Sequence, residues 1–202
     1  LAPQVGQLIG IVIHGRRTAV GDQLLELHLA QQGIDEHERQ LLSTVLNVLR
    51  TGPVPSASIH DAEQSAAVIV LGADLLNDAP RLALALLQCI RQQPMERVDE
   101  LKIPQWDEAA VRNAVQNRRG PLFLAGYQRT WFHAYATDSY FAAPDDIARL
   151  GFAVAGTIGH GAPSVPDLSC EVRELAQRIA EALTHAKRPL IIAGTASGSQ
   201  AT

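Results

Sequence analysis

The chain has 202 residues, of which 47% are hydrophobic and 19% charged, and it carries a net charge of −4. This is ordinary globular composition, sufficient for one large or two small domains, and the acidic balance argues against a nucleic-acid partner, which would need a basic face. No apolar run approaches the roughly 20 residues that span a bilayer, so we expect no direct membrane insertion.

The two ends of the sequence predict a fragment. The chain begins with Leu1, and its only methionine is Met95. It ends just after an apolar run, 189–193, and a loop of small residues, 194–199, and in an α/β protein such a loop normally leads into a helix. We therefore expect this chain to be part of a longer polypeptide.

The residues that could bind metals are few and poorly spaced. Cys89 and Cys170 are the only cysteines, whereas an iron–sulfur cluster normally needs four thiolates. Cys89 lies in an apolar helical stretch and is expected in the core, and Cys170 is expected at a helix N-terminus. No two of the seven histidines are three to five residues apart, so no helical metal pair is predicted. We assign no metal ligand and no catalytic residue.

The first third of the chain predicts one strand and two helices. Leu8–Ile13 has the composition of a strand, and Leu24–Ala30 that of a short helix closing at Gly33. Asp35 and Glu38 have the spacing of a capping box. A helix with a leucine and valine stripe should follow them and end at Gly52, before a loop over 53–62.

The remaining elements alternate between strands and helices. Strands are predicted at Ala66–Leu71, Pro121–Ala125 and Pro189–Ala193, all apolar and each followed by glycine. Helices are predicted over 82–91, with Pro80 in the first turn and Asn77 or Asp78 as the cap, after Asp107, from Pro144 through Val154, and over 172–183. A loop is predicted over 156–166, and 131–135 is left unassigned.

This order predicts an α/β fold. Fully apolar strands that alternate with helices are typical of a Rossmann-like, doubly wound, mainly parallel sheet with helices on both faces. We expect residues 1–202 to form one α/β domain, with 1–33 either part of it or a looser N-terminal lobe.

The strand-end loops are the candidate binding site, because ligands of open parallel sheets bind at the carboxyl ends of the strands. The residues concerned are Gly72, Asp74, Gly126, Gly194 and Gly198. Glycine there would let a backbone approach a phosphate, but it also ends strands for conformational reasons, and we favour the second interpretation. Asp74 and Asp78 are interpreted as capping residues. The GTIGHG stretch at 156–161 follows a helix, the wrong context for a dinucleotide loop.

Four stretches carry a family resemblance. They are AAVIVLGADLLNDAPRLALALLQ (66–88), KIPQWDEAAVRNAVQNRRGPLFLA (102–125), APDDIARLGFAVA (143–155) and AKRPLIIAGTASGS (186–199). In their order and spacing they resemble the C-terminal, molybdopterin-oxidoreductase-like region of the large iron–sulfur subunit, the G subunit, of bacterial NADH:quinone oxidoreductase, respiratory complex I. Residues 1–33 match only faintly.

The resemblance implies a structural, non-catalytic domain. Formate dehydrogenases and nitrate reductases, which this region is similar to, hold the nucleotide halves of a bis-molybdopterin cofactor in strand-end loops that tend to read Gly-x-Asn-Pro. Here Asp74 stands in place of the neutral amide, and a carboxylate would repel a pyrophosphate. The resemblance therefore implies that no cofactor is bound in this chain.

The resemblance also implies where the domain sits. The iron–sulfur clusters would lie in the N-terminal part of the parent chain. The partners would be that part and other subunits of the peripheral arm, on the cytoplasmic side of the bacterial inner membrane.

Two other classes stay open. Residues 185–199 also resemble the central domain of thiamine-diphosphate enzymes, which sometimes binds a flavin or an adenine nucleotide, although residues 66–88 have no obvious counterpart there. A nucleotide-binding regulatory module is the third possibility. Both predict affinity for a ligand, whereas the structural domain predicts little or none.

Overall fold

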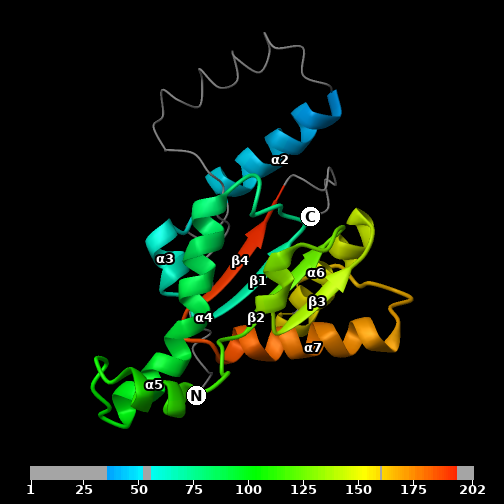
Figure 1. Cartoon of the computed structure of the whole chain (residues 1–202). Helices are drawn as coiled ribbons and strands as arrows, with labels where there is room; N and C mark the ends of the chain where they lie inside the picture. The colour runs from blue at the N-terminus through cyan, green and yellow to red at the C-terminus, as the bar shows by residue number, and fades with distance from the viewer. Residues whose placement is uncertain (1–35, 52–55, 160, 195–202) are drawn as a thin grey trace.

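A computed structural model describes residues 36–51, 56–159 and 161–194. The strand predicted at 8–13, the helix predicted at 24–30 and the predicted lobe 1–33 lie outside these residues. Four parallel strands form a sheet in the order β3-β2-β1-β4. They are β1 (Ala67–Leu71), β2 (Leu122–Gly126), β3 (Asp138–Phe141) and β4 (Pro189–Ala193). Figure 1 shows them between the helices, with β1 central.

Both faces of the sheet are covered, as the fully apolar strands predicted. On the first face, helices α3 (Ile59–Glu63) and α4 (Pro80–Glu100) pack against alternate strand residues such as Val68, Leu122 and Leu190. On the second face, α6 (Pro144–Ile158) and α7 (Cys170–His185) pack against Ile69, Phe123 and their neighbours. The prediction of a doubly wound parallel α/β fold is confirmed.

The region before β1 is more helical than predicted. Helix α2 (Glu36–Thr51) ends just before Gly52, as its stripe and terminator indicated. The loop predicted over 53–62 is wrong in part, because α3 begins within it. Ser58 accepts a hydrogen bond from the Asp61 amide at 3.2 Å, and Asp61 accepts one from the Ser58 amide at 2.8 Å. This reciprocal pair is a capping box, and it was visible in the sequence.

Helix α4 is longer than the predicted 82–91, because it continues through Pro94. A proline inside a helix removes one N–H and leaves the carbonyl four residues earlier without its partner. That carbonyl belongs to Ile90, and the Gly120 amide donates to it at 2.7 Å. The segment leading into β2 thus satisfies the group that Pro94 leaves free.

The caps of α4 and α5 (Glu108–Val115) give one wrong and one confirmed prediction. The N-cap of α4 is Ala79, which makes no side-chain capping bond, so the assignment of Asn77 or Asp78 is wrong; Pro80 is at the first position as predicted. Asp107 caps α5 by accepting from the Ala110 amide at 3.1 Å.

The edge strand β3 was not predicted. Its sequence, DSYF, shows no apolar run, and none of its residues is fully buried. It is preceded by the unassigned 131–135 segment, which is a short 3₁₀ helix, η1 (Trp131–Tyr135). Thr137 then docks on β2, donating its amide to Leu122 O at 2.7 Å and accepting from the Leu122 amide at 3.1 Å.

The helices of the second face begin where predicted. Pro144 is the first residue of α6, and Ser169 caps α7 by accepting from the Val172 amide at 3.3 Å. The loop predicted to begin at Gly156 is wrong by one turn, because α6 extends to Ile158. Gly156 is therefore helical, which agrees with our rejection of 156–161 as a dinucleotide loop.

Candidate functional site

The predicted strand-end residues lie together at one edge of the sheet. Gly72, Gly126 and Gly194 follow or end β1, β2 and β4, which are adjacent and parallel. Asp74 belongs to the loop after β1, and Gly198 lies outside the described residues. The strand order turns back between β1 and β4, where an open α/β sheet normally has its ligand crevice.

The crevice between β1 and β4 is closed by the protein itself. A Cβ atom built on Gly194 would lie 2.6 Å from both Cα and Cβ of Ala73. The loop after β1 is therefore pressed directly onto the end of β4. Gly194 is needed for this close approach, which leaves no room for a ligand between Ala73 and Gly194.

Two glycine amides at this edge are also engaged. The Gly72 amide donates to Ala125 O at 2.9 Å, and the Gly194 amide donates to Leu71 O at 3.1 Å. Phosphate-binding loops work by presenting free N–H groups. Gly72 has φ of 62°, a conformation that favours glycine, so its presence is explained by the turn after β1.

Asp74 stabilises the turn that leads to α4. Its carboxylate accepts from the Asn77 amide at 3.2 Å and from Asn77 Nδ2 at 2.6 Å, while its carbonyl accepts from the Asp78 amide at 2.9 Å. The capping prediction for Asp74 is therefore right only in part, because Asp74 caps this turn and not helix α4, whose N-cap is Ala79. A carboxylate fixed at this position would also repel an anionic ligand.

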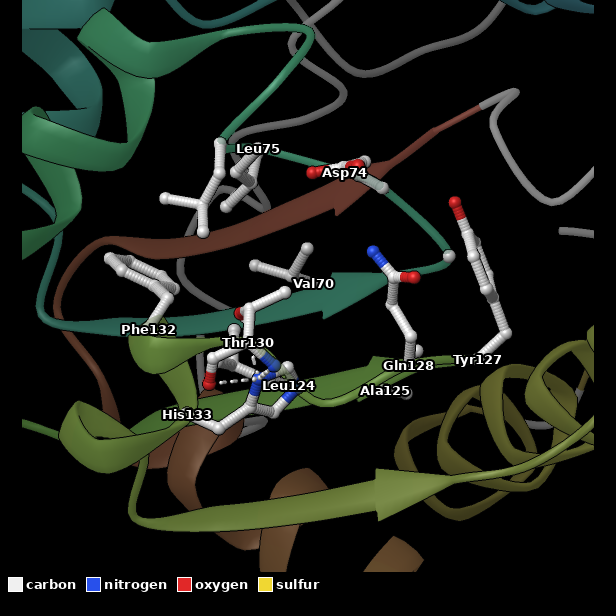
Figure 2. A pocket seen from close by; sticks show the side chains of 14 residues that line it. Val70, Asp74, Leu75, Leu124, Ala125, Tyr127, Gln128, Thr130, Phe132 and His133 are labelled. Carbon is white, nitrogen blue, oxygen red and sulfur yellow. Dashed lines mark hydrogen bonds between the residues drawn. The ribbon is translucent and has the colours of Figure 1, made fainter.

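A small pocket remains between the ends of β1 and β2 (Figure 2). Its apolar end contains Val70, Leu75, Leu124 and Phe132, and Tyr127 and Gln128 stand at the other end, as Figure 2 shows. Its volume is about 40 Å³. A water needs about 10–15 Å³, and small-molecule sites usually measure about 300–1,000 Å³. The pocket therefore has room for a few waters and not for a nucleotide.

His133 is the imidazole that lines this pocket, and no role was predicted for it from the sequence. Its Nδ1 accepts from the Thr130 amide at 3.0 Å and lies 3.0 Å from Thr130 Oγ1. Burial lowers the pKa of His133. The Thr130 carbonyl oxygen, 3.2 Å from Nδ1, opposes this effect because it favours the protonated ring, and the nearby Arg129 adds to the lowering. The lowered pKa favours the neutral ring, which can accept the hydrogen bond that caps η1. The Thr130-x-x-His133 spacing is the sequence feature from which this cap could have been predicted.

A larger depression, of about 340 Å³, lies between α6, α7 and the loop joining them. Arg173 is the cationic side chain on its wall, and its guanidinium already donates to Leu168 O at 3.3 Å.

Within 36–51, 56–159 and 161–194, no group of three or more His, Cys, Asp or Glu side chains could hold a metal ion. None of the helices described there is both long and apolar enough to cross a membrane.

The two cysteines differ as predicted. Cys89 is buried and donates its thiol to Ser65 O at 3.0 Å, and burial raises its pKa to about 12, with a small opposing effect of Arg188. Cys170 is exposed at the start of α7.

A thiol titration should separate these two residues, because the thiolate is the reactive form. In the native chain, we expect Ellman's reagent to modify Cys170 within minutes and Cys89 only after denaturant is added. Cys170→Ser should abolish the native reaction and leave one thiol in the unfolded chain. Modification of Cys89 under native conditions would show that the α4 core opens readily.

Strand order, layers and crossovers define a Rossmann-like α/β domain. No family model matches the chain. It is 45% identical over 169 residues to the G subunit of NADH-quinone oxidoreductase from Pseudomonas fluorescens, covering 84% of this chain and 19% of the relative. It is 38% identical over 169 residues to the G subunit from Shewanella oneidensis, covering 84% and 19%. The G subunit from Escherichia coli K12 is 36% identical over 167 residues, covering 83% and 18%.

The chain is therefore homologous to a region of the G subunit of NADH-quinone oxidoreductase, as the resemblance predicted. It spans about a fifth of the length of the curated relatives it matches.

Proposed function

We propose that this chain is an architectural domain of the large iron–sulfur subunit of a respiratory NADH–quinone oxidoreductase, and that it contributes no catalytic group to electron transfer. The observation that carries the proposal is the closed crevice between β1 and β4. Ala73 packs against Gly194 where a dinucleotide would need space, and the Gly72 and Gly194 amides are already hydrogen-bonded. The identity of the enzyme, NADH-quinone oxidoreductase, is taken from the names of the relatives.

The remainder of the proposal follows from the resemblance. The iron–sulfur clusters belong to the N-terminal part of the parent chain. This domain binds no cofactor and packs against that part and against other subunits of the peripheral arm, on the cytoplasmic side of the bacterial inner membrane. Trp106 is 83% exposed in the connection between α4 and α5, and an indole left in solvent suits a surface that a neighbouring protein covers.

A thermal-shift screen of the purified chain tests the absence of a ligand. The panel contains NADH, FAD, ADP, GDP, thiamine diphosphate and molybdopterin guanine dinucleotide. A ligand at 100 times its Kd would stabilise the fold by about 2.7 kcal/mol, which corresponds to a rise in Tm of about 5–10 °C at this chain length. We expect no shift, and no stoichiometric iron or molybdenum by elemental analysis.

Each positive result would point to a different class of protein. A shift with FAD or ADP would favour the central domain of a thiamine-diphosphate enzyme, and a shift with NADH or GDP a regulatory nucleotide site. Asp74→Asn is the matched variant, because it removes the negative charge and keeps a side-chain oxygen for the Asn77 amide. An affinity that rises in this variant would locate the ligand at the strand ends and overturn the architectural proposal.

A further inference from the structure

The first face of the edge strand β3 is incompletely covered. Tyr140 packs against the core of the second face, and side chains alternate along a strand, so Phe141 points to the first face. The His133 ring, from η1, lies 4.7 Å from the Phe141 ring, yet Phe141 is still 42% exposed. The short helix η1 therefore leaves an aromatic ring of the sheet in contact with solvent.

The tryptophan of η1 is exposed and fixed in place by its neighbours. Trp131 is 58% exposed, whereas Phe132 is buried. The Trp131 ring stands edge-on to the rings of Phe132 and Tyr135, at centroid distances of 5.8 and 5.9 Å. A side chain that is already ordered loses little conformational entropy when a partner covers it. This indole is therefore well suited to be part of an interface.

Two arginines lie over rings of the same surface. The Arg119 guanidinium is 4.9 Å from the centroid of the Tyr135 ring, and its Nη1 donates to Ala134 O at 3.0 Å. The Arg129 guanidinium is 6.0 Å from the centroid of the Phe141 ring. A guanidinium stacked on an aromatic ring keeps N–H groups at its edge with which it can bind a carboxylate. We call these side chains together the η1 surface: Arg119, Arg129, Trp131, His133, Tyr135 and Phe141.

The charge around the η1 surface is positive, although the chain as a whole has a net charge of −4. Residues 109–137 contain four arginines and neither aspartate nor glutamate. In the part of the chain that the structure describes, none of these arginines forms an ion pair. The next carboxylate in the sequence, Asp138, is paired with Arg178 of α7. The η1 surface is therefore complementary to a surface that presents carboxylates.

We propose that the η1 surface binds a carboxylate-bearing surface of another subunit in the assembled enzyme. The proposal rests on the architectural function and adds to it the site of contact and the charge of the partner. Trp, Tyr and Arg are the residues that most often dominate the energy of protein–protein interfaces. A nucleic-acid partner would need a broad basic face, whereas here a few arginines stand on an acidic chain.

Zero-length crosslinking in the assembled complex tests this contact. A carbodiimide joins a lysine amine to a carboxylate as an amide and takes up the water released to become a urea, whereas arginine does not react. Arg119→Lys and Arg129→Lys in the full-length subunit keep the positive charge and supply the amine. We expect new crosslinked peptides that join position 119 or 129 to an aspartate or glutamate of a different subunit. The wild-type complex is the control and should give neither peptide.

Other crosslinking results would overturn the proposal. A product with a carboxylate of the same subunit or of a second copy would assign the η1 surface to that contact. No product from either variant would mean that no carboxylate lies against it. Nucleic acid that is retained by the wild-type complex and lost in Arg129→Glu would assign the surface to nucleic acid instead.

Charge reversal gives a second readout. Arg129→Glu in the full-length subunit should lower the salt concentration at which the subunits separate by roughly twofold, because an attraction becomes a repulsion that salt screens. Lys187→Glu is the matched control, since Lys187 is exposed beside β4, at the opposite edge of the sheet. Equal salt dependence of the two variants would also overturn the proposal.

The ligand screen described above separates this proposal from the architectural function. If the expected crosslinks are missing and no ligand raises Tm, the assignment of the η1 surface is wrong and the architectural function stands. If the crosslinks form and a ligand does raise Tm, the contact is right and the domain has a binding function as well.

Discussion

Substituting Gly194 by alanine should destabilise the fold by about 1–3 kcal/mol, the usual range of overpacking in a closely packed core. The added Cβ would lie 2.6 Å from the Ala73 Cα and 3.2 Å from its amide nitrogen. Contact with backbone cannot be relieved by rotating a side chain, so the loop after β1 must move. The measurement is the free energy of unfolding from urea denaturation.

The matched control is a glycine with free space. Gly156 lies in α6, and a Cβ there would meet nothing within 4 Å. Gly156→Ala should stabilise the protein by about 0.5–1 kcal/mol, because alanine loses less conformational freedom in a helix. Adding Ala73→Gly to Gly194→Ala should restore only part of the loss, since the Ala73 Cα stays in place. Equal effects at positions 194 and 156 would mean that the crevice is not tightly closed.

The sequence predicts the central elements well because a strand buried on both faces consists almost entirely of apolar residues. Ala67–Leu71 and Leu122–Gly126 consist of apolar residues buried on both sides, and few other structures suit such runs. Helix α7 has a clear stripe and a serine cap, and both are present in the structure. In elements at the middle of a layered fold, nearly every residue is buried and therefore apolar, which makes them easy to recognise in the sequence.

Elements held by long-range contacts were missed. The edge strand β3 has only one strand neighbour, and its Asp138 forms an ion pair with Arg178 of α7. Neither contact is visible in the four letters DSYF. Likewise, the extension of α4 past Pro94 depends on the hydrogen bond from Gly120 to Ile90, two residues that are distant in the sequence. Local propensity alone would end the helix before the proline.

The candidate site was also predicted only in part: its position follows from the sequence, and its long-range contacts do not. The position of glycine at three strand ends placed Gly72, Gly126 and Gly194 at one edge of the sheet, and the structure agrees. Whether such a loop can take a phosphate depends on where its amides point and on which backbone lies opposite. The contact of Ala73 with Gly194 joins residues from distant parts of the chain, so spacing alone could not predict it.

The two cores should respond independently to substitution, because the sheet separates them. Leu86 of α4 is fully buried on the first face, and Ile179 of α7 is 1% exposed on the second. Leu86→Ala should cost about 2–5 kcal/mol through lost burial and the cavity it leaves, and Ile179→Val about 0.5–1.5 kcal/mol. The milder change at Ile179 keeps the double variant folded enough to measure.

A double-mutant cycle by urea denaturation checks this separation. The two decreases in the free energy of unfolding should add to within about 0.5 kcal/mol, because Leu86 and Ile179 pack on opposite faces of the sheet and lie on different helices. The matched control is the double variant Leu86→Ala, Ala83→Gly. Both residues lie on α4 and pack into the core of the first face, so their effects on stability are expected to be coupled. Coupling above about 1 kcal/mol between Leu86 and Ile179 would mean that the strands shift when one core is weakened. The closed strand-end crevice would then be deformable from either face, and its closure would no longer support the proposal that this chain binds no cofactor.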